Sequence, residues 1–219
     1  MKKYNMKPIV PSLEDNDLIK IIEAIEIDSP PIYVTVKPDK NSIIDECYKN
    51  VAEKVRNEGG FQVIGWQIWK TKNLIEAEFH SIWKSSDGEF IDITPKQALF
   101  HEILFIEDKK RFYDGCQVDN IRINISGNLL VDDLISVCEI LFKIENKGSR
   151  VNEYQISLVG EELLIWKILQ QMKSGLSLML SQGLTKNQMC FCGSNKYRKC
   201  HGRFLTCVQE RLNQQCHSS

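Results

Sequence analysis

Residues 61–95 read FQVIGWQIWKTKNLIEAEFHSIWKSSDGEFIDITP, and they determine the type of fold. β-Branched and aromatic residues are concentrated in FQVIGWQIW (61–69) and LIEAEFHSIWK (74–84), which predicts two strands. The turn signal SSDG (85–88) separates the second strand from EFIDITP, a third strand that Pro95 ends. The stretch therefore predicts antiparallel strands joined by short turns.

The segments on either side add two strands and a helix. IYVTV (32–36) and ILFIED (103–108) have strand composition. A helix is expected over Asn41–Glu58, where Gly59-Gly60 ends it. Its apolar stripe consists of Ile43, Ile44, Cys47, Val51 and Val55.

The second half of the chain has helical periodicity. Apolar residues recur at helical spacing over Leu129–Leu141 and again over Glu153–Leu184, where Gly160 and Gly175 weaken or divide the pattern. The expected fold class is α+β, with a helix packed on an antiparallel sheet, followed by further helices.

Composition excludes several classes of protein. Of 219 residues, 42% are hydrophobic and 26% are charged, which is typical of a globular chain and argues against disorder. No uncharged apolar run reaches the ~18 residues of a spanning helix, and no apolar core of a secretory signal follows the N-terminus. We therefore expect a cytoplasmic protein without a membrane span.

Charge is distributed unevenly along the chain. From Lys167 to the C-terminus there are eight basic residues and one acid, Glu210, so this part carries +7 and the first 166 residues carry −8. A basic end of this kind either binds an anionic partner or lies against the acidic body of the same protein.

The segment CFCGSNKYRKCHG, which begins at Cys190, has the composition of a metal site. In a reducing compartment, clustered cysteine and histidine indicate metal binding rather than disulfides. Three thiolates and one imidazole can close a tetrahedral site that suits one Zn²⁺ ion, and a filled four-ligand set is structural rather than catalytic. The expected ligands are Cys190, Cys192, Cys200 and His201.

This segment resembles the SEC-C motif, the zinc-binding tail of the bacterial preprotein-translocase ATPase and of many other proteins. The resemblance rests on Cys-X-Cys-Gly-Ser, on Lys-Tyr-Arg-Lys and on Cys-His-Gly, with seven residues between the second and third ligands where the family usually has eight. It implies a docking module for a protein, ribosomal or nucleic-acid partner. The basic residues expected to contact that partner are Lys196, Arg198, Lys199 and Arg203.

Three residues of the first half have the order of a thiol-hydrolase site. Cys47 lies in the expected helix, His80 in the second long strand and Asp92 in the strand that follows. Thiol catalysis needs a thiolate, a base and a group that orients the base, and adjacent strands could place His80 beside Asp92. The alternative is a buried core thiol, a hydrogen-bonded strand histidine and a turn-forming acid.

The same region resembles the core of the transglutaminase-like and papain-like superfamily. The counterparts are Cys47, Gly65-Trp66, His80 and Asp92-Ile93-Thr94-Pro95. The resemblance implies that Cys47 is the nucleophile, His80 the general base and Asp92 the orienting acid. The family sets its cysteine at a helix N-terminus, which requires a helix that starts near Asp45 rather than at Asn41.

Residues 111–122, RFYDGCQVDNIR, combine a turn with a cluster of polar side chains. Such a segment is either a loop that contacts substrate or a hydrogen-bonded hairpin, and the turn at Asp114-Gly115 favours the hairpin.

Two functions of different classes follow from these patterns. The first is a cysteine-dependent hydrolase or acyltransferase that acts on an amide or peptide bond and has a zinc-binding docking tail. The second is a non-catalytic zinc-binding adaptor, with nucleic-acid binding through the basic tail as a weaker form of it. The expected organisation is an α+β core domain over 1–125, a helical segment over 126–186 and a zinc-binding tail over 187–219.

Overall fold

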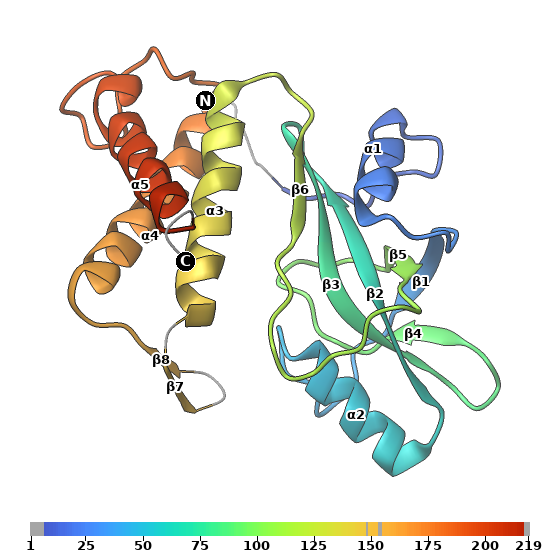
Figure 1. Ribbon diagram of the computed structural model, residues 1–219. Helices are drawn as coiled ribbons and strands as arrows, with labels where there is room; N and C mark the ends of the chain where they lie inside the picture. Colours follow the sequence, from blue (N-terminus) through green and yellow to red (C-terminus); the bar gives the residue numbers. More distant parts are fainter. Residues whose placement is uncertain (1–6, 148, 153–154, 217–219) are drawn as a thin grey trace. The chain divides into compact units, whose positions relative to one another are not determined.

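The computed structural model describes residues 7–147, 149–152 and 155–216, and the chain divides into two compact units. Pro8–Ile125 form a strand-rich unit, here called the barrel unit, and Ser126–Ser219 form a mainly helical unit, here called the helical unit (Figure 1). The class is therefore mixed α and β, as the sequence predicts.

Five strands of the barrel unit close into a barrel. The sheet order is β2-β5-β1-β4-β3-β6, and an additional pairing of β2 with β3 closes the circle while β6 extends β3. The strands are β1 (Ile32–Val36), β2 (Phe61–Lys70), β3 (Leu74–Lys84), β4 (Phe90–Asp92), β5 (Glu102–Glu107) and β6 (Ile121–Asn124). The strands expected at 32–36, 61–69, 74–84, 89–95 and 103–108 are thus confirmed, although the one before Pro95 is shorter than expected and ends at Asp92.

The expectation of a wholly antiparallel sheet is wrong at one pairing. β1 runs parallel to β4, with Thr35 opposite Ile91 and Val36 opposite Asp92. The chain reaches β4 from β1 through a helix and the β2–β3 hairpin, a connection long enough for a parallel pair. Asp92 is thereby placed between two neighbouring strands.

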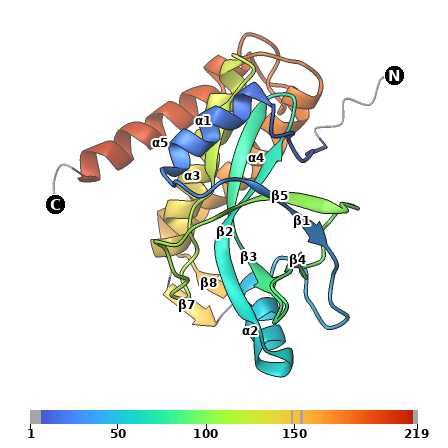
Figure 2. The ribbon, with the colours of Figure 1, turned by 90° about the vertical axis from the view of Figure 1, so that its right-hand side faces the viewer.

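Two helices pack against the barrel. Figure 2 shows α1 (Asn16–Ile25) beside one end of the β2–β3 ribbon and α2 (Cys47–Glu58) beside the other. Helix α1 was not expected from the sequence, although Asp15 caps it by accepting from the backbone N–H of Asp17. Its buried stripe is Leu18, Ile21 and Ile25.

The helix expected from Asn41 begins six residues later, at Cys47. Asp45 has a left-handed backbone with φ of 63°, which interrupts helical geometry just before the helix. The side-chain amide of Asn50 bonds both the backbone N–H and the carbonyl of Ile43, at 2.9 and 2.7 Å, and fixes the preceding turn. Gly59 ends the helix, as predicted.

The two faces of the strands bury different apolar groups. The outer face meets α1 through Trp66, Ile68, Ile75, Ala77 and Phe79. The barrel interior is filled by Val34, Val63, Ile82, Ile103 and Phe105. Since side chains alternate along a strand, His80 shares the inward face of β3 with Ile82.

The helical unit is built on α3 (Leu129–Lys147), which packs against α4 (Gly160–Ser181) and α5 (His201–Cys216). A short hairpin of β7 (Ser149–Asn152) and β8 (Gln155–Ser157) precedes α4. The helix expected from Glu153 thus begins at Gly160, whose φ is 60°, while Gly175 lies within α4 without ending it. Within the described residues, no helix is long and apolar enough to cross a membrane.

Candidate functional site

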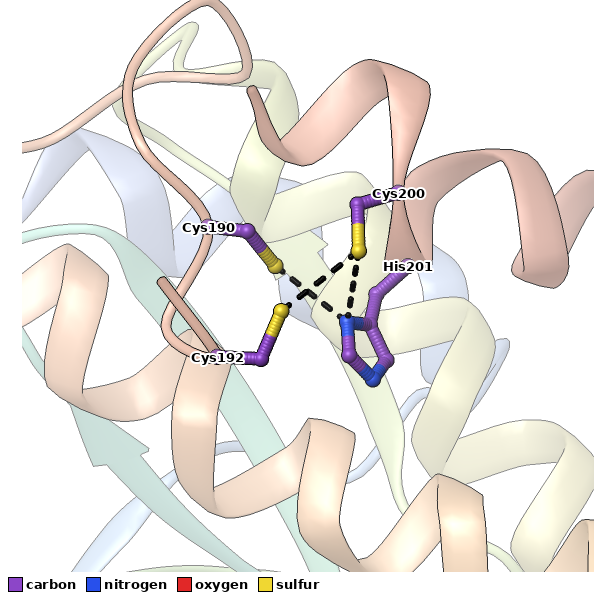
Figure 3. A group of neighbouring side chains, drawn as sticks. All are labelled: Cys190, Cys192, Cys200 and His201. Atoms are coloured by element: carbon purple, nitrogen blue, oxygen red, sulfur yellow. Dashed lines mark hydrogen bonds between the residues drawn. The ribbon is translucent and has the colours of Figure 1, made fainter. Parts of the chain in front are cut away.

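Four potential metal ligands meet in the helical unit. The ligand atoms of Cys190, Cys192, Cys200 and His201 all lie within 4.8 Å of one another (Figure 3). His201 Nδ1 is 3.2 Å from Cys190 Sγ and 3.4 Å from Cys200 Sγ, and the sulfurs of Cys192 and Cys200 are 3.5 Å apart. Tetrahedral ligands of a zinc ion would be separated by roughly 3.5–3.8 Å, given Zn–S near 2.3 Å. The expected Cys3His group is therefore assembled and could hold one metal ion.

Local backbone geometry places these ligands. Gly193 adopts a φ of 74° and donates its N–H to the carbonyl of Cys190 at 2.8 Å, which turns the chain after the second ligand. The third and fourth ligands sit on the turn into α5, of which His201 is the first residue. The two ligand pairs of the sequence, Cys190 with Cys192 and Cys200 with His201, thus lie on two tight turns that face each other.

The metal-ligand segment is packed onto the helices of its unit. Tyr197 is fully buried. Its burial and, to a smaller extent, the negative charge of Asp133 raise the pKa of its phenol. The ring of Phe191 lies 4.4 Å from that of His201 and fills the space beside Gly175, where a β-carbon would come within 2.3 Å of it. Gly175 is therefore a contact position rather than a helix break.

The four basic residues predicted to contact a partner are exposed around this site. Lys196, Arg198, Lys199 and Arg203 all have exposed side chains. Elsewhere in the helical unit, Lys186 pairs with Asp133 at 2.8 Å, so that lysine is part of the internal packing.

Cys47 is the first residue of α2 and is 7% exposed. The N-terminus of a helix favours a negative charge, because its unpaired N–H groups carry partial positive charge. Glu46 at the N-cap makes no side-chain hydrogen bond to these groups. Cys47 thus lies at the N-terminus of α2 and not two turns inside it.

His80 and Asp92 meet inside the barrel unit. The ring Nε2 of His80 lies 3.2 Å from Oδ2 of Asp92, and the side chains are 4% and 0% exposed. Asp92 follows Ile91, which pairs with Trp83 of β3, so it lies diagonally opposite His80 on neighbouring strands. With Nε2 directed at the carboxylate, Nδ1 is the remaining ring nitrogen.

Burial and charge act in opposite directions on this pair. Burial disfavours the imidazolium, but the negative charges of Asp92 and Cys47 outweigh it and raise the pKa of His80 to about 9. Burial likewise disfavours the carboxylate, yet His80 and Lys96 lower the pKa of Asp92 to about 2. The geometry therefore favours an ion pair of Asp92 with a protonated His80.

Lys96 is a member of this cluster that the sequence analysis missed. Its Nζ lies 2.6 Å from Asp92 Oδ2, 3.3 Å from His80 Nε2 and 2.8 Å from Gln67 Oε1. A lysine directly after Thr94-Pro95 has the pattern of an exposed loop residue, and no periodicity marks it as buried.

The N-terminal turn of α2 is tied to the strand end that holds Asp92. Asn50 Nδ2 donates to Thr94 Oγ1 at 3.3 Å, and the backbone N–H of Thr94 donates to Asp92 Oδ1 at 3.0 Å. Cys47 is a free, buried cysteine, and it is near enough to His80 to influence the pKa of the imidazole. The structure thus joins His80 to Asp92 directly and brings Cys47 near them.

The hairpin predicted over residues 111–122 is wrong. The flanking strands β5 and β6 pair with different partners, β5 with β1 and β2 and β6 with β3, so the segment between them crosses the barrel as a loop. Within it, Tyr113 stacks on Tyr48 with ring centroids 3.8 Å apart. The loop therefore lies beside the residue that follows Cys47.

Comparison with protein-family models, with curated proteins and with solved structures finds no match to this chain.

Proposed function

We propose that the barrel unit is a cysteine-dependent hydrolase or acyltransferase with a papain-like or transglutaminase-like site, acting on an amide or peptide bond. The observation that carries the proposal is that Cys47 starts α2, a helix that packs on β3, and that β3 and β4 hold the buried His80–Asp92 pair. The three residue types and their order match the needs of thiol catalysis.

Each residue has a distinct role in the proposed reaction. His80 already carries the thiol proton as an imidazolium before the reaction, and the Cys47 thiolate attacks the carbonyl carbon to form a C–S bond and an oxyanion. The imidazolium then gives its proton to the leaving nitrogen as the C–N bond breaks, which leaves a thioester. Water or an acceptor amine, deprotonated by His80, attacks the thioester and releases the thiol. Asp92 keeps its charge throughout and orients the ring.

The oxyanion is best assigned to backbone N–H groups at the start of α2. These donors point outward from the helix end and require no reorganisation when charge develops on the substrate oxygen. A glutamine side chain is a possible alternative donor to the oxyanion, and the first glutamine of the chain is Gln62. Its Nε2 already donates to Ser81 Oγ at 2.9 Å and to the carbonyl of Tyr48 at 3.3 Å, so we do not assign it this role.

Alkylation by iodoacetamide at pH 6.5 tests the proposal without a known substrate. An unperturbed thiol is only about 1% ionised at this pH. We expect Cys47, although buried, to react faster than the exposed Cys116, and His80→Ala to remove that advantage. His101→Ala is the matched control, because His101 is exposed. Equal rates for Cys47 in the wild type and in His80→Ala would favour the adaptor function.

The second function, a docking module, is supported by the Cys3His group of the helical unit. We propose that this SEC-C-like group binds one structural Zn²⁺, since three thiolates and one imidazole suit zinc and leave no open position. The exposed Lys196, Arg198, Lys199 and Arg203 would then face an anionic protein, ribosomal or nucleic-acid partner. A reducing, cytoplasmic setting is part of this proposal, since the proposed metal site needs its cysteines in the reduced form.

A further inference from the structure

Lys96 is a nearly buried cation at the candidate active site, with a side chain that is only 10% exposed. Burying an ammonium is costly unless each of its hydrogens finds an acceptor or an anion. Lys96 has such partners in Asp92 and Gln67, and it also approaches the ring of His80. The position of the Lys96 side chain is therefore fixed by contacts with residues of the candidate active site.

A second group of polar residues holds Lys96 in place. Gln67, which is 3% exposed, accepts from Lys96 through Oε1 and donates through Nε2 to Glu78 Oε2 at 2.5 Å. The indole N–H of Trp69 donates to the same oxygen of Glu78 at 3.1 Å. A continuous chain of polar contacts thus runs from β2 and β3 to Asp92.

The carboxylate of Asp92 is shared between two cations. Lys96 is the nearer of the two, at 2.6 Å against 3.2 Å for His80, and both approach Oδ2. Neither contact has the directional geometry of a hydrogen bond, so both act through charge. The positive charge of Lys96 therefore offsets part of the negative charge of Asp92 that would otherwise hold the proton on His80.

We propose that Lys96 is a positioning residue that acts on His80 both directly and through Asp92, keeping the carboxylate ionised while limiting how tightly the imidazolium holds its proton. This inference rests on the proposed thiol chemistry.

Lys96 would allow His80 to release its proton to the leaving nitrogen, although Asp92 and Cys47 both favour the protonated ring. The charged or titratable groups set against His80 are Cys47 of α2, Asp92 of β4 and Lys96 of the loop after β4; the first two raise the pKa of His80 and Lys96 lowers it. In the proposed reaction the ring N–H bond must break as the leaving nitrogen gains the proton. A cation 3.3 Å from the ring makes that transfer easier.

Three variants of Lys96 separate its charge from its hydrogen bonds. Lys96→Met removes both, Lys96→Gln keeps a donor without the charge, and Lys96→Arg keeps the charge. The matched control is Lys109→Met, since Lys109 is 73% exposed and lies 3.8 Å from Glu107. NMR titration of the His80 ring, assigned with His80→Gln, and the pH profile of Cys47 alkylation are measured for each.

We expect Lys96→Met and Lys96→Gln to raise the titration midpoint of His80 by about one pH unit or more, a tenfold change in proton affinity. The midpoint at the alkaline end of the pH profile of Cys47 alkylation should move in the same direction. Lys96→Arg and Lys109→Met should leave both midpoints unchanged. Lys96→Gln retains hydrogen-bonding capacity, so it reports on charge even if Lys96→Met fails to fold.

The two proposals fail in different ways. If Cys47 is reactive and depends on His80, but Lys96→Gln leaves both midpoints unchanged, the inference about Lys96 is overturned and the thiol function stands. If the His80 midpoint rises while Cys47 reacts no faster than Cys116, the electrostatic role of Lys96 is supported and the thiol function is not.

Discussion

The ring of His80 on β3 lies 3.2 Å from the carboxylate of Asp92 on β4, and both side chains are buried inside one closed barrel. Hydrogen-bonded strands on either side fix the two backbones, so the pair is part of the framework of the barrel unit. Changes to either residue should therefore affect both stability and reactivity.

Stability should depend on pH through His80. Its pKa is raised from 6.5 to about 9, so the stabilisation is fully present below pH 6.5 and is lost as the pH rises through 9. Each unit of pKa difference corresponds to about 1.4 kcal/mol. Urea unfolding of the barrel unit should show a falling midpoint between pH 6.5 and 9.5. His80→Gln should flatten that slope, and a slope that persists in this variant would assign it to another group.

Asp92→Asn should weaken the barrel unit more than it weakens the proposed chemistry. The substitution leaves Lys96 as a buried cation without its nearest anion, and breaking such a pair typically costs about 3–5 kcal/mol. The substitution leaves the His80 ring in the site, whereas His80→Ala removes it, so the alkylation rate of Cys47 should fall less than in His80→Ala. Asp119→Asn is the control, since Asp119 pairs with Arg122 away from the site. A larger loss of reactivity in Asp92→Asn than in His80→Ala would contradict the assigned roles.

Loss of one metal ligand should release the metal and destabilise the helical unit beyond its last thirty residues. Tyr197 is fully buried and Phe191 packs against Gly175 of α4, so the ligand segment belongs to the core of its unit. We expect one zinc per chain in the wild type and none in Cys190→Ser or Cys200→Ser by elemental analysis. Cys207→Ser, at an exposed position, should keep the metal. Zinc retained in both ligand variants would exclude the site.

Gly175→Ala should destabilise the helical unit although alanine favours helices. A β-carbon at this position would lie 2.3 Å from the ring of Phe191, and overpacking of this kind typically costs about 1–3 kcal/mol. Ser174→Ala, on an exposed position of the same helix, is the control for helix propensity. Thermal unfolding of the zinc-loaded protein measures both, and an unchanged or raised midpoint for Gly175→Ala would show that Phe191 can move away.

Binding of an anionic partner should depend on the basic residues beside the metal site. Arg198→Ala with Lys199→Ala should weaken binding, whereas Lys167→Ala with Lys173→Ala removes the same charge from exposed positions on α4 and should not. If the partner is nucleic acid and six phosphates are contacted, affinity should fall roughly thousandfold between 50 and 200 mM salt. Affinity that is insensitive to salt would indicate an apolar protein interface.

The sequence predicted what depends on local spacing. The β-branched and aromatic residues of 61–69 and 74–84 specify the β2–β3 hairpin, and the spacing of Cys190 to His201 specifies the Cys3His group, because in both cases the contacting residues are neighbours in the chain. The start of α2 could not be read, since helix-compatible residues begin at Asn41 and only the left-handed backbone of Asp45 delays the helix.

The remaining differences arise from contacts between distant segments. The parallel pairing of β1 with β4 follows from closure of the barrel, which no local pattern encodes. Lys96 is drawn inside by Asp92 and Gln67, which are near it in space, and Gln67 is remote in sequence. The hairpin over 111–122 was expected from its turn residues, whereas the pairing of β5 and β6 with different strands decides the path of the chain.

Barrel closure also bears on hydrogen exchange. His80 and Asp92 lie on strands with neighbours on both sides, so their amides should be among the slowest of the barrel unit to exchange. Cys47 is carried by a helix that side-chain bonds attach to the strands: Asn50 to Thr94, Gln62 to the carbonyl of Tyr48 and Trp83 to the carbonyl of Gly59. Local unfolding of α2 would therefore separate the Cys47 sulfur from the His80 imidazole long before the imidazole separated from the Asp92 carboxylate. Helix α2 is thus the more mobile part of the site.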